Sequence, residues 1–550
     1  MRVTSELTVS ASPPATLVSP RAPVLAHTND PTIDRVRGHV GHSRRNIAVG
    51  WLTSVALTLL AFAIRFPGLA NPKELVFDET YYPKDAWTLL HLGYEGSWPD
   101  PDKANKQIAQ GMVDIWNHDP SFIVHPQLGK WLIAASESVF GMNSFGWRFS
   151  SLIFGCLLVF ITVRLVRRIT RSNLIAGLTG LLLCLDGLNF VMSRIGLLDI
   201  FQAFFVVAAV SCLAADRDWF RERLARHLER TGQPDLGRRF GPALWWRPWR
   251  LGAGILFGMA CGTKWNALYI LAAFALLSLT WDIGARRLAG AGQRAWWGLL
   301  RDGIPAFITL VIVSAGVYLA TWSTWLATSR GYDRQWGAQN PGAWTTKLLG
   351  RPLASLLHYH KEIYNFHTGD YIMHATHSYN ANPAGWLFMI RPIGIAATND
   401  IQPRTDGCPV GTETCLRVIS GAGTPVLWWA AAVAFAVAIV WWVGARDWRF
   451  GVPVIGALSA WLPWFPVSDR PEFFFYAIVM IPFTAIGLAM CIGLVIGPAS
   501  GGRRRMFGCI AAGALVALVG ANFAFMYPIL TNAVLTRSQW LARMWLRSWI

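Results

Sequence analysis

Charged residues are scarce in this sequence, and their scarcity argues against an ordinary soluble protein. Asp, Glu, Lys and Arg make up only 15% of the 550 residues, whereas about 25% is usual for a soluble domain. Hydrophobic residues account for 53% of the chain, and its mean hydropathy is +0.35. Many uncharged runs approach the ~20 residues with which a helix crosses a bilayer. We therefore predict a polytopic membrane protein of the all-α class.

Metal and redox motifs are missing as well. The eight Cys residues include no CxxC pair, and no His-rich stretch offers the spacing of a metal site. We therefore expect no metal and no cofactor. Cys408 and Cys415 are the only close pair in a predicted outer segment, where a small disulfide and two free thiols both stay open as interpretations.

The basic residues form no single patch of the kind that binds nucleic acid, although the net charge is +18. They lie mainly in alternate loops between the apolar runs, as the positive-inside rule requires of a membrane protein. We therefore expect no nucleic-acid partner. The loops rich in Arg mark the cytoplasmic face.

A cleavable signal peptide and an internal repeat of fixed period are not visible either. Residues 1–45 are instead rich in Pro, Ser, Thr, Ala and Arg, a composition that predicts a disordered tail. Arg44 and Arg45 stand immediately before the first apolar run and predict that this tail stays in the cytoplasm. The lack of a repeat argues mildly against a transporter built from duplicated halves.

Eleven apolar runs predict eleven membrane spans, with the N-terminus inside and the C-terminus outside. They cover about residues 47–64, 149–166, 174–192, 196–215, 251–263, 265–281, 304–324, 425–443, 452–466, 473–494 and 507–527. Residues 46–550 thus form one membrane domain with two large outer segments, 66–147 and 325–423. Each contains an amphipathic stretch that predicts an interfacial helix, IAQGMVDIW in the first and PLASLLHYHKEIYNFH in the second.

Charged residues of both signs nevertheless occur near the outer ends of the spans, where charge is costly and calls for a partner or a function. The acidic pair Asp78 and Glu79 lies in VFDETYYPKDAW. The others are Arg148, Arg194, Asp199, Lys264, Arg391 and Arg470. Taken singly, each cation is equally well explained by contact with headgroup phosphates, and the acidic pair by an exposed loop. Their convergence on one face instead predicts an anion site that faces a carboxylate site.

Lys264 shows how deep these charges lie. Only 13 uncharged residues separate it from Arg250, and a helix of that length spans about 20 Å, less than the ~30 Å of a bilayer core. Lys264 should therefore stop near the outer headgroups. Cations there stabilise a lipid phosphate as it leaves, and a carboxylate takes the proton of an attacking hydroxyl. The pattern predicts group transfer from a lipid phosphate to a hydroxyl acceptor outside the membrane.

With these residues the sequence resembles the protein O-mannosyltransferases, in particular their shorter actinobacterial branch. Besides FDE, the matching segments are HPQLGKWLI (125–133), SRIGLLDIF (193–201), GTKWNALY (262–269), HKEIYNFHTG (360–369), HSYNANPAGWLFMIRPI (377–393) and RPEFFFYAI (470–478). They follow the family's order over almost the whole chain after the tail. Two segments depart from the family's pattern: Gln127 replaces a usual Pro, and HSYNANPAGW lacks the Lys of HPYESKPW. The segment 325–423 is too short to hold the MIR domain of the eukaryotic relatives.

The resemblance implies a GT-C membrane fold and an inverting, metal-independent transfer of mannose from polyprenyl-phosphate-mannose, which is a substrate and not a cofactor. The acceptors would be Ser or Thr hydroxyls of exported polypeptides at the outer face of the cell membrane, where a secretion channel is a candidate partner. The implied roles are Asp78 as general base, Glu79 as its companion, Arg148, Lys264, Arg391, Arg470 and His377 at the donor phosphate, and Arg194 and Asp199 as supporting residues.

Two other interpretations stay open. A related GT-C glycosyltransferase would use a lipid-linked sugar on a glycan or lipid acceptor. A non-enzymatic transporter would place ionisable residues along broken helices at the membrane midplane. Here most of them lie at the outer boundary, and Asp186 within the third predicted span is the exception.

Overall fold

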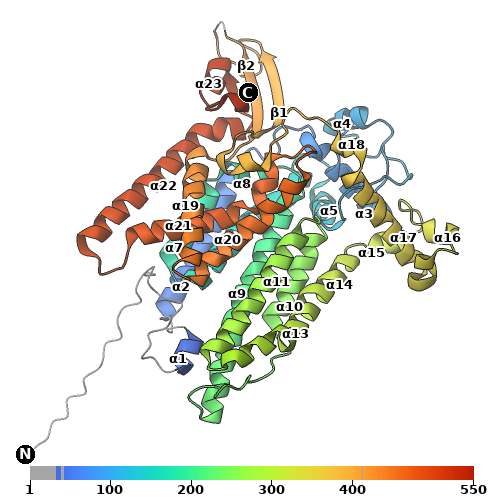
Figure 1. Ribbon diagram of the computed structural model, residues 1–550. Helices are drawn as coiled ribbons and strands as arrows, with labels where there is room; N and C mark the ends of the chain where they lie inside the picture. The colour runs from blue at the N-terminus through green and yellow to red at the C-terminus, as the bar shows by residue number, and fades with distance from the viewer. Residues whose placement is uncertain (1–31, 39–42, 412) are drawn as a thin grey trace, which may run out of the picture.

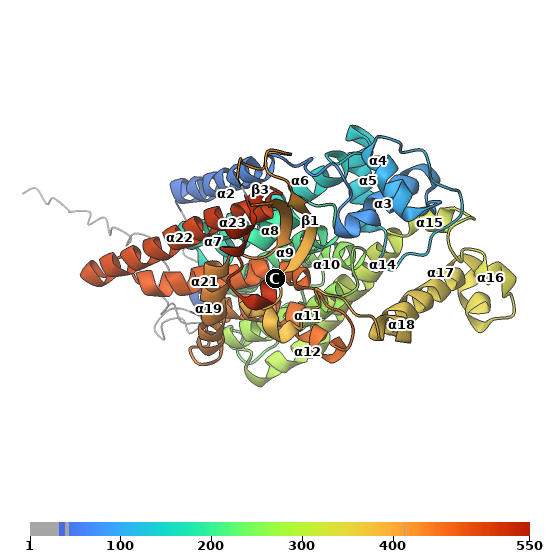
Figure 2. The ribbon, with the colours of Figure 1, turned by 90° about the horizontal axis from the view of Figure 1, so that it is seen from above.

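The computed structural model describes residues 32–38, 43–411 and 413–550. Long helices packed side by side form most of the molecule, and a small sheet projects from one end (Figure 1). Seen from above, α22 and α16 lie at opposite edges of the helical bundle (Figure 2).

Eight helical segments within the described residues are long and apolar enough to cross a membrane. They are α2 (Arg44–Arg65), α6 (Gly146–Thr170), α9 (Asp199–Thr231), α11 (Ala267–Leu288), the segment Gly292–Ala320, α19 (Pro425–Val443), the segment Trp448–Val467 and α22 (Gly502–Leu530). Three shorter helices, α7 (Asn173–Cys184), α10 (Pro248–Cys261) and α21 (Ile481–Ile496), coincide with the other predicted runs. The structure thus places a helix at every predicted span, but only eight of these have the length of a full crossing among the described residues, so the count of eleven spans stays a prediction.

Two of the long segments are composite. The first consists of η2 (Gly292–Trp297), α12 (Gly298–Arg301), α13 (Gly303–Phe307), η3 (Ile308–Ile312) and α14 (Val313–Ala320). The second consists of α20 (Trp448–Trp461) and η5 (Leu462–Val467). η3 is a π-helical turn, which continues the helix through the segment that was predicted as a single span.

Asp186 divides the third predicted span into two helices. α7 ends at Cys184, and α8 (Gly187–Met192) begins just after Asp186. The Asp186 carboxylate accepts the backbone N–H of Asn189 at 2.7 Å and the Nε1–H of Trp428 at 2.6 Å. An acidic side chain that bonds a backbone N–H in this way begins a helix and does not suit a helix interior. The one acid inside this predicted span is therefore a helix cap.

Part of the predicted tail is helical. α1 (Thr32–Arg37) packs on α9 through the buried Val36, and Arg37 donates to Glu222 at 3.0 Å and to Glu229 at 2.6 Å. The prediction of disorder is wrong for this stretch. It rested on the average composition of the tail, which does not show that the apolar and charged residues of α1 match a surface on α9. Residues 1–31 and 39–42 of the predicted tail lie outside the described residues.

The first outer segment contains η1 (Phe77–Thr80), α3 (Tyr82–Leu92), α4 (Pro101–Ala109) and α5 (Leu128–Phe140). The interfacial helix predicted in IAQGMVDIW is wrong. α4 ends at Ala109, and Gly111 has a φ of +90°, in the left-handed region that glycine adopts readily and that commonly ends a helix. The apolar residues that follow are therefore not on a helical face.

The second outer segment contains α15 (Ser323–Ala327), α16 (Trp336–Gln339), α17 (Trp344–Thr368), α18 (Asp370–Met373) and η4 (Pro383–Phe388). α17 confirms the helix that was predicted here. It buries Leu356, Tyr359 and Ile363, whose spacing of three and four residues places them on one face. The chain then continues into strands.

A three-stranded antiparallel sheet connects the end of the chain to the second outer segment. The sequence analysis did not predict this sheet. β1 (Ile393–Ile401) pairs with β2 (Cys415–Gly421), and β2 pairs with β3 (Val534–Thr536). β3 follows α22 directly and leads to α23 (Arg537–Leu541) and η7 (Arg547–Trp549). The C-terminus therefore lies on the same side as the second outer segment, as the predicted topology requires.

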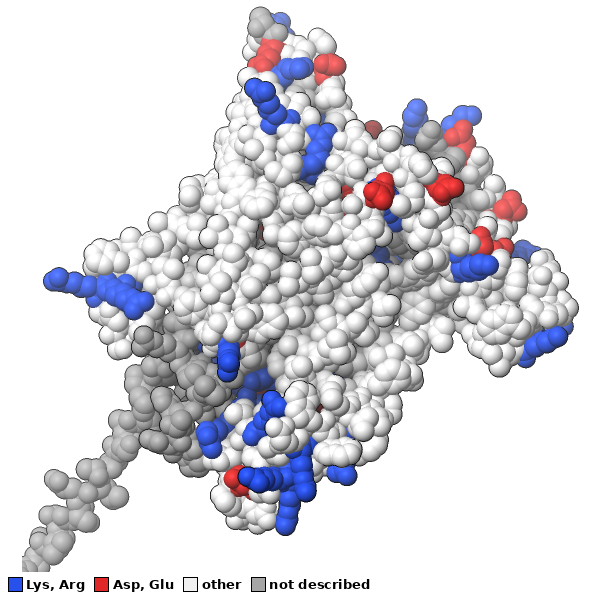
Figure 3. Space-filling view, viewed as in Figure 1, with Lys and Arg blue, Asp and Glu red and all other residues white. Residues whose placement is uncertain are grey.

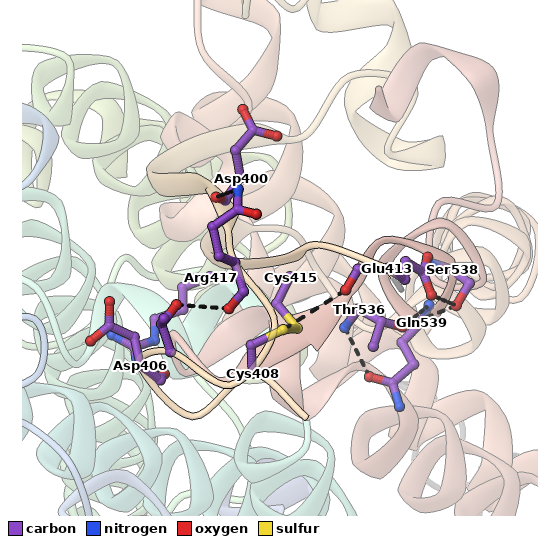
Figure 4. The surroundings of a disulfide bond; sticks show 11 residues. Asp400, Asp406, Cys408, Glu413, Cys415, Arg417, Thr536, Ser538 and Gln539 are labelled. Carbon is purple, nitrogen blue, oxygen red and sulfur yellow. Dashed lines mark hydrogen bonds between the residues drawn. A yellow bond between two sulfur atoms is a disulfide. The ribbon is translucent and has the colours of Figure 1, made fainter. Parts of the chain in front are cut away.

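A disulfide joins Cys408 and Cys415 in the connection between β1 and β2 (Figure 4). This decides between the two interpretations that the sequence leaves open. Next to it, the Glu413 carboxylate accepts the backbone N–H of Ser538 at 2.6 Å and the Ser538 hydroxyl at 3.0 Å. These bonds fasten the hairpin to the start of α23.

Candidate active site

The acidic pair lies in η1, a single 3-10 turn between α2 and α3. Phe77 opens this turn with a φ of +49°, a conformation that is rare for a bulky residue. Its ring packs against Phe473 and Phe475 at centroid distances of 6.0 and 5.6 Å. At the other end of the turn, the Glu79 carboxylate accepts the backbone N–H of Val76 at 3.1 Å. Aromatic packing and a carboxylate thus fix η1 from two directions.

Glu79 turns inward and pairs with Arg148, which lies in α6. Its two carboxylate oxygens accept the Nε–H and an Nη2–H of Arg148, each at 2.7 Å, which is a bidentate pair. Glu79 also accepts the backbone N–H of Gly196 at 2.8 Å. The Glu79 side chain is 0% exposed and the Arg148 side chain 1%. The pair therefore lies within the protein and away from the surface of the site.

The remaining N–H groups of Arg148 hold the chain that leads into η1. They donate to the carbonyls of Leu69 at 3.2 Å, Pro72 at 2.7 Å and Glu74 at 3.0 Å. An arginine has five N–H donors, and these contacts together with Glu79 use all of them. As arranged, Arg148 has no donor left for a phosphate.

Asp78 has different surroundings from Glu79. It is half-buried, and its carboxylate accepts a hydrogen bond from the Tyr82 hydroxyl. Burial raises the pKa of Asp78 to about 6, while the charge of Lys264 opposes this shift and that of Asp199 adds to it. A carboxyl whose pKa lies near the working pH suits a general base.

Lys264 and Asp199, whose charges both act on Asp78, form an ion pair with each other. The Lys264 Nζ is 2.8 Å from one Asp199 oxygen and 2.7 Å from the other. The same Nζ lies 5.7 Å from the ring centroid of Phe475 and 5.4 Å from that of Tyr476. Asp199 opens α9, and Lys264 lies in the turn between α10 and α11. This short turn is what carries the cation to the end of the bundle beside η1.

Arg470 contributes a second cation, and it has fewer partners than Lys264. Its Nη1 makes long contacts with His367, 3.5 Å to Nδ1 and 3.4 Å to the carbonyl. Its Nε is buried without a partner among the described residues. The His367 ring stacks on His125 at 5.7 Å. Burial, followed by the charge of Lys264, holds the pKa of His125 well below its usual value, so this ring adds no positive charge at neutral pH.

Glu472 is a second buried acid beside Arg470. The residue is 1% exposed, and neither of its carboxylate oxygens has a hydrogen-bond partner among the described residues. Burial raises the pKa of Glu472 to about 7, against the effect of the Arg470 charge. Buried polar atoms are usually paired. Two neighbouring side chains with unpaired atoms therefore mark a place where a polar ligand fits.

Arg391 and His377 lie together at the outer edge of the site. Arg391 donates to the Ser378 carbonyl at 2.8 Å, to the Ile550 carbonyl at 2.9 Å and to the Ser548 carbonyl. The exposed His377 ring packs edge-on against Phe473 at 4.9 Å. Arg391 thus connects the segment that carries His377 to the C-terminal residues.

Arg194, like Arg391, holds backbone segments together by donating to carbonyls. Its guanidinium donates to the carbonyls of Arg65 and Pro67 at 2.8 Å and of Gly68 at 2.9 Å. These carbonyls belong to the end of α2 and the residues after it, where the backbone acceptors have no partner in the helix. Arg194 therefore fixes the start of the first outer segment.

The structure brings four of the predicted residues together. The charges of Asp78, Asp199 and Arg470 all act on the Tyr476 hydroxyl, and Lys264 contacts the same ring. Glu79, Arg148, Arg194 and Arg391 instead bond to each other or to protein carbonyls. Residues of the site that the sequence analysis did not single out are Tyr82, His125, His367, Glu472 and Tyr476. All but Tyr82 lie in the segments that carry the family resemblance, which was the available signal.

No group of three or more His, Cys, Asp or Glu side chains among the described residues is arranged to hold a metal ion. The positive charge at this site is that of Lys264 and Arg470. What the arrangement offers chemically is a carboxylate that accepts a proton near neutral pH, next to cations that attract an anion.

Comparison with known proteins gives matches over most of the chain. The family model described as dolichyl-phosphate-mannose-protein mannosyltransferase matches residues 55–326, and the model described as the C-terminal four-TMM region of protein-O-mannosyltransferase matches residues 352–549. The polyprenol-phosphate-mannose–protein mannosyltransferase of Mycobacterium tuberculosis (strain H37Rv) is 37% identical over 508 residues, which are 91% of this chain and 92% of that protein. The protein of the same name from Corynebacterium glutamicum is 32% identical over 512 residues, 90% of this chain and 93% of that protein.

Among solved structures, the fold resembles that of a protein O-mannosyltransferase complex of S. cerevisiae bound to the sugar donor. The TM-score is 0.68 and the sequence identity 13%, with 94% of each chain covered. At this level of identity the likeness concerns the fold. It supports the GT-C architecture that the sequence predicts.

Proposed function

The chain belongs to the dolichyl-phosphate-mannose–protein mannosyltransferase family, and we propose that it transfers mannose from polyprenyl-phosphate-mannose to Ser and Thr hydroxyls of exported proteins. It is a GT-C glycosyltransferase that moves mannose from a lipid-linked donor to protein, as the two family models and the long relatives indicate. The acceptor residue, the export of the acceptor and the outer face of the cell membrane are the parts that we add.

The observation that carries the proposed mechanism is the position of Asp78 beside Lys264. We assign Asp78 as the general base. It takes the proton of the acceptor hydroxyl while that oxygen forms a bond to the anomeric carbon of mannose. The bond from this carbon to the phosphate oxygen breaks at the same time, and polyprenyl phosphate leaves with the electron pair. One displacement inverts the anomeric centre.

Arg470 and Lys264 are the residues that we assign to the donor phosphate. Negative charge grows on the phosphate as the sugar leaves, and fixed cations lower the energy of that state without reorganising. The unpaired Nε of Arg470 and the unpaired oxygens of Glu472 support a donor placed beside them, with phosphate at the cation and sugar hydroxyls at the acid. Asp199 keeps the Lys264 ammonium in place before the donor binds.

Glu79 and Arg148 are better described as positioning residues than as groups that touch substrate. Their bidentate pair fixes η1, and the further donors of Arg148 fix the chain that precedes it. Arg391 and His377 shape the outer edge of the site in the same way. These assignments replace the phosphate contact that the resemblance implies for Arg148 and keep His377 as a neighbour of the site.

We further propose that the N-terminus is cytoplasmic and that the site faces outward. At the end of the molecule where α9 ends, the charged side chains in view are mainly Lys and Arg, whereas the other end shows Lys and Arg together with most of the acidic side chains (Figure 3). The positive-inside rule assigns the basic end to the cytoplasm. Exported chains would then reach the site as they leave a secretion channel.

The function is tested with radiolabelled polyprenyl-phosphate-mannose and the full chain in nanodiscs. We expect label on a Thr-containing exported peptide, no label when each Thr is replaced by Val, and the same rate after EDTA treatment. Labelling of a glycan or lipid while the Thr peptide stays unlabelled would favour the related glycosyltransferase. A rate that EDTA abolishes and added cation restores would contradict the metal-free mechanism.

The rate of transfer should fall below about pH 6. The pKa of Asp78 is raised to about 6, so the carboxylate dominates above this pH and the protonated acid below it, and only the carboxylate accepts a proton. The measured kcat/KM should drop about tenfold per pH unit on the acidic side and level off above about pH 7. A profile that stays level down to pH 5, with donor binding unchanged, would contradict the assignment.

Replacing Arg470 by Gln should raise the KM for the donor roughly 10- to 100-fold, because a charge-assisted hydrogen bond to a phosphate contributes about 1.5–3 kcal/mol. Donor titration at saturating peptide measures this. Arg404→Gln is the control, since Arg404 is exposed in the connection between β1 and β2 and the charge change is the same. Equal donor KM values in both variants would place the phosphate elsewhere.

A further inference from the structure

A cavity of about 720 Å³ lies far from Asp78. It is lined by the last turns of α9, the loop after α9 and the segment from η2 to α12. α9 has 33 residues and is therefore about 50 Å long. Asp199 of the active site opens this helix, and Thr231 of the cavity closes it. Because a bilayer core is about 30 Å thick, the cavity lies on the opposite side of the membrane from the active site.

Three arginines give this cavity a strong positive charge. Arg239, Arg294 and Arg301 line it, all three side chains are exposed, and among the described residues none of them forms an ion pair. Two nearby acids already form ion pairs: Asp302 pairs with Arg286 at 2.7 Å, and Glu229 pairs with Arg37 at 2.6 Å. A third acid, Asp235 in the loop after α9, accepts the backbone N–H of Gly237 at 2.6 Å.

The wall beneath these arginines is built from buried contacts. Arg286 donates to the Asp302 carboxylate at 2.7 Å and also to the carbonyls of Phe240 at 2.8 Å and Pro242 at 3.1 Å. These bonds fix the loop that carries Arg239. The Arg301 guanidinium lies 5.3 Å from the centroid of the Phe240 ring. The cavity is therefore shaped before any ligand arrives.

One side of the cavity is apolar and reaches the membrane. Trp297 and Leu300 line it and are 58% and 56% exposed. Both belong to the segment Gly292–Ala320, which is long and apolar enough to cross a membrane. Tryptophan at the end of a span is typical of the headgroup layer. The cavity thus offers cations next to a surface that lies against acyl chains.

We propose that this cavity binds the phosphate headgroup of an anionic phospholipid in the leaflet opposite the active site, with the acyl chains along Trp297 and Leu300. The three free arginines match the charge of the headgroup, and the exposed apolar side chains match its tails. Residues 1–31 of this chain carry two arginines against one Glu and one Asp, so they do not offer the negative charge that this cavity requires.

Binding of phosphatidylglycerol to the purified full-length protein, followed by native mass spectrometry, tests the proposal. The variant is Arg294→Gln with Arg301→Gln. Its control is Arg503→Gln with Arg504→Gln, which removes the same charge from exposed positions at the start of α22. We expect phosphatidylglycerol binding to weaken about tenfold or more in the first variant and less than about twofold in the control. Thermal unfolding without added lipid should be the same in both.

Three further results would overturn the proposal. Equal losses in the two variants would indicate general attraction of lipid to a basic surface. Equal binding of phosphatidylcholine by the unaltered protein would exclude recognition of the negative charge. Displacement of the lipid by inorganic phosphate at the same concentration would show a site for a soluble anion, because the tails would then contribute nothing.

Discussion

Replacing Asp78 by Asn should lower the rate of mannose transfer at least about a hundredfold, since a positioned general base typically contributes about 10²–10⁴. Asn has nearly the same shape and still accepts the hydrogen bond from Tyr82, but it cannot take a proton. The loss should appear in kcat with little change in the donor KM, because Asp78 does not touch the phosphate in our assignment. Single-turnover transfer to a Thr peptide measures it.

The same variant should fold as well as the unaltered protein. The pKa of Asp78 in the folded protein, about 6, lies above its ordinary value of 3.8. The folded state therefore binds the proton more tightly, and stability falls as the pH rises between these two values. At neutral pH the ionised Asp78 is thus unfavourable for folding, and a neutral Asn removes that cost. Unchanged thermal unfolding would separate lost chemistry from lost structure.

Asp370→Asn is the matched control for this variant. Asp370 opens α18 in the second outer segment, and its side chain is exposed, so the substitution removes one negative charge outside the site. We expect its transfer rate to stay within about twofold of normal, as is usual for surface changes. Near-normal mannosylation by the Asp78→Asn variant would end the assignment of the base.

The position of Lys264 just beyond the end of a short helix could be predicted from the sequence, because it depends only on local spacing. The short run after Arg250 limits how far α10 reaches, and in the structure α10 has 14 residues and ends just before Lys264. The convergence of Asp78, Asp199, Lys264 and Arg470 on one face could be predicted for the same reason. Each lies close to the end of an apolar run, and alternate ends of successive spans meet at one side of the membrane.

The partners of these charges could not be predicted in that way. Arg148 is 69 positions from Glu79, and no local pattern tells a cation that binds phosphate from one that binds a buried carboxylate. The same holds for Arg391, whose acceptors include carbonyls at the very end of the chain. The sheet that brings this end close has short strands and a long separation between β2 and β3.

Replacing Arg148 by Met should reduce the free energy of unfolding by about 3–5 kcal/mol, the usual cost of removing one partner of a buried ion pair. Among the described residues, Glu79 would keep only two donors, the backbone N–H groups of Gly196 and Val76, and would stay buried. The carbonyls of Leu69, Pro72 and Glu74 would lose their donors too. Thermal unfolding of the protein in nanodiscs measures the loss.

A positioning role and a phosphate-binding role for Arg148 differ in what rescues the variant. If Arg148 acts through Glu79, the double variant Arg148→Met with Glu79→Gln should lose clearly less stability than the sum of the single variants, because no buried charge is left unpaired. If Arg148 bound phosphate, removing Glu79 would rescue nothing, and the donor KM of the single variant would rise as in Arg470→Gln. A stable Arg148→Met protein with a raised donor KM would therefore support the phosphate contact. An unstable Arg148→Met protein that Glu79→Gln rescues would support the positioning role, in which Arg148 holds η1 so that Asp78 meets the acceptor.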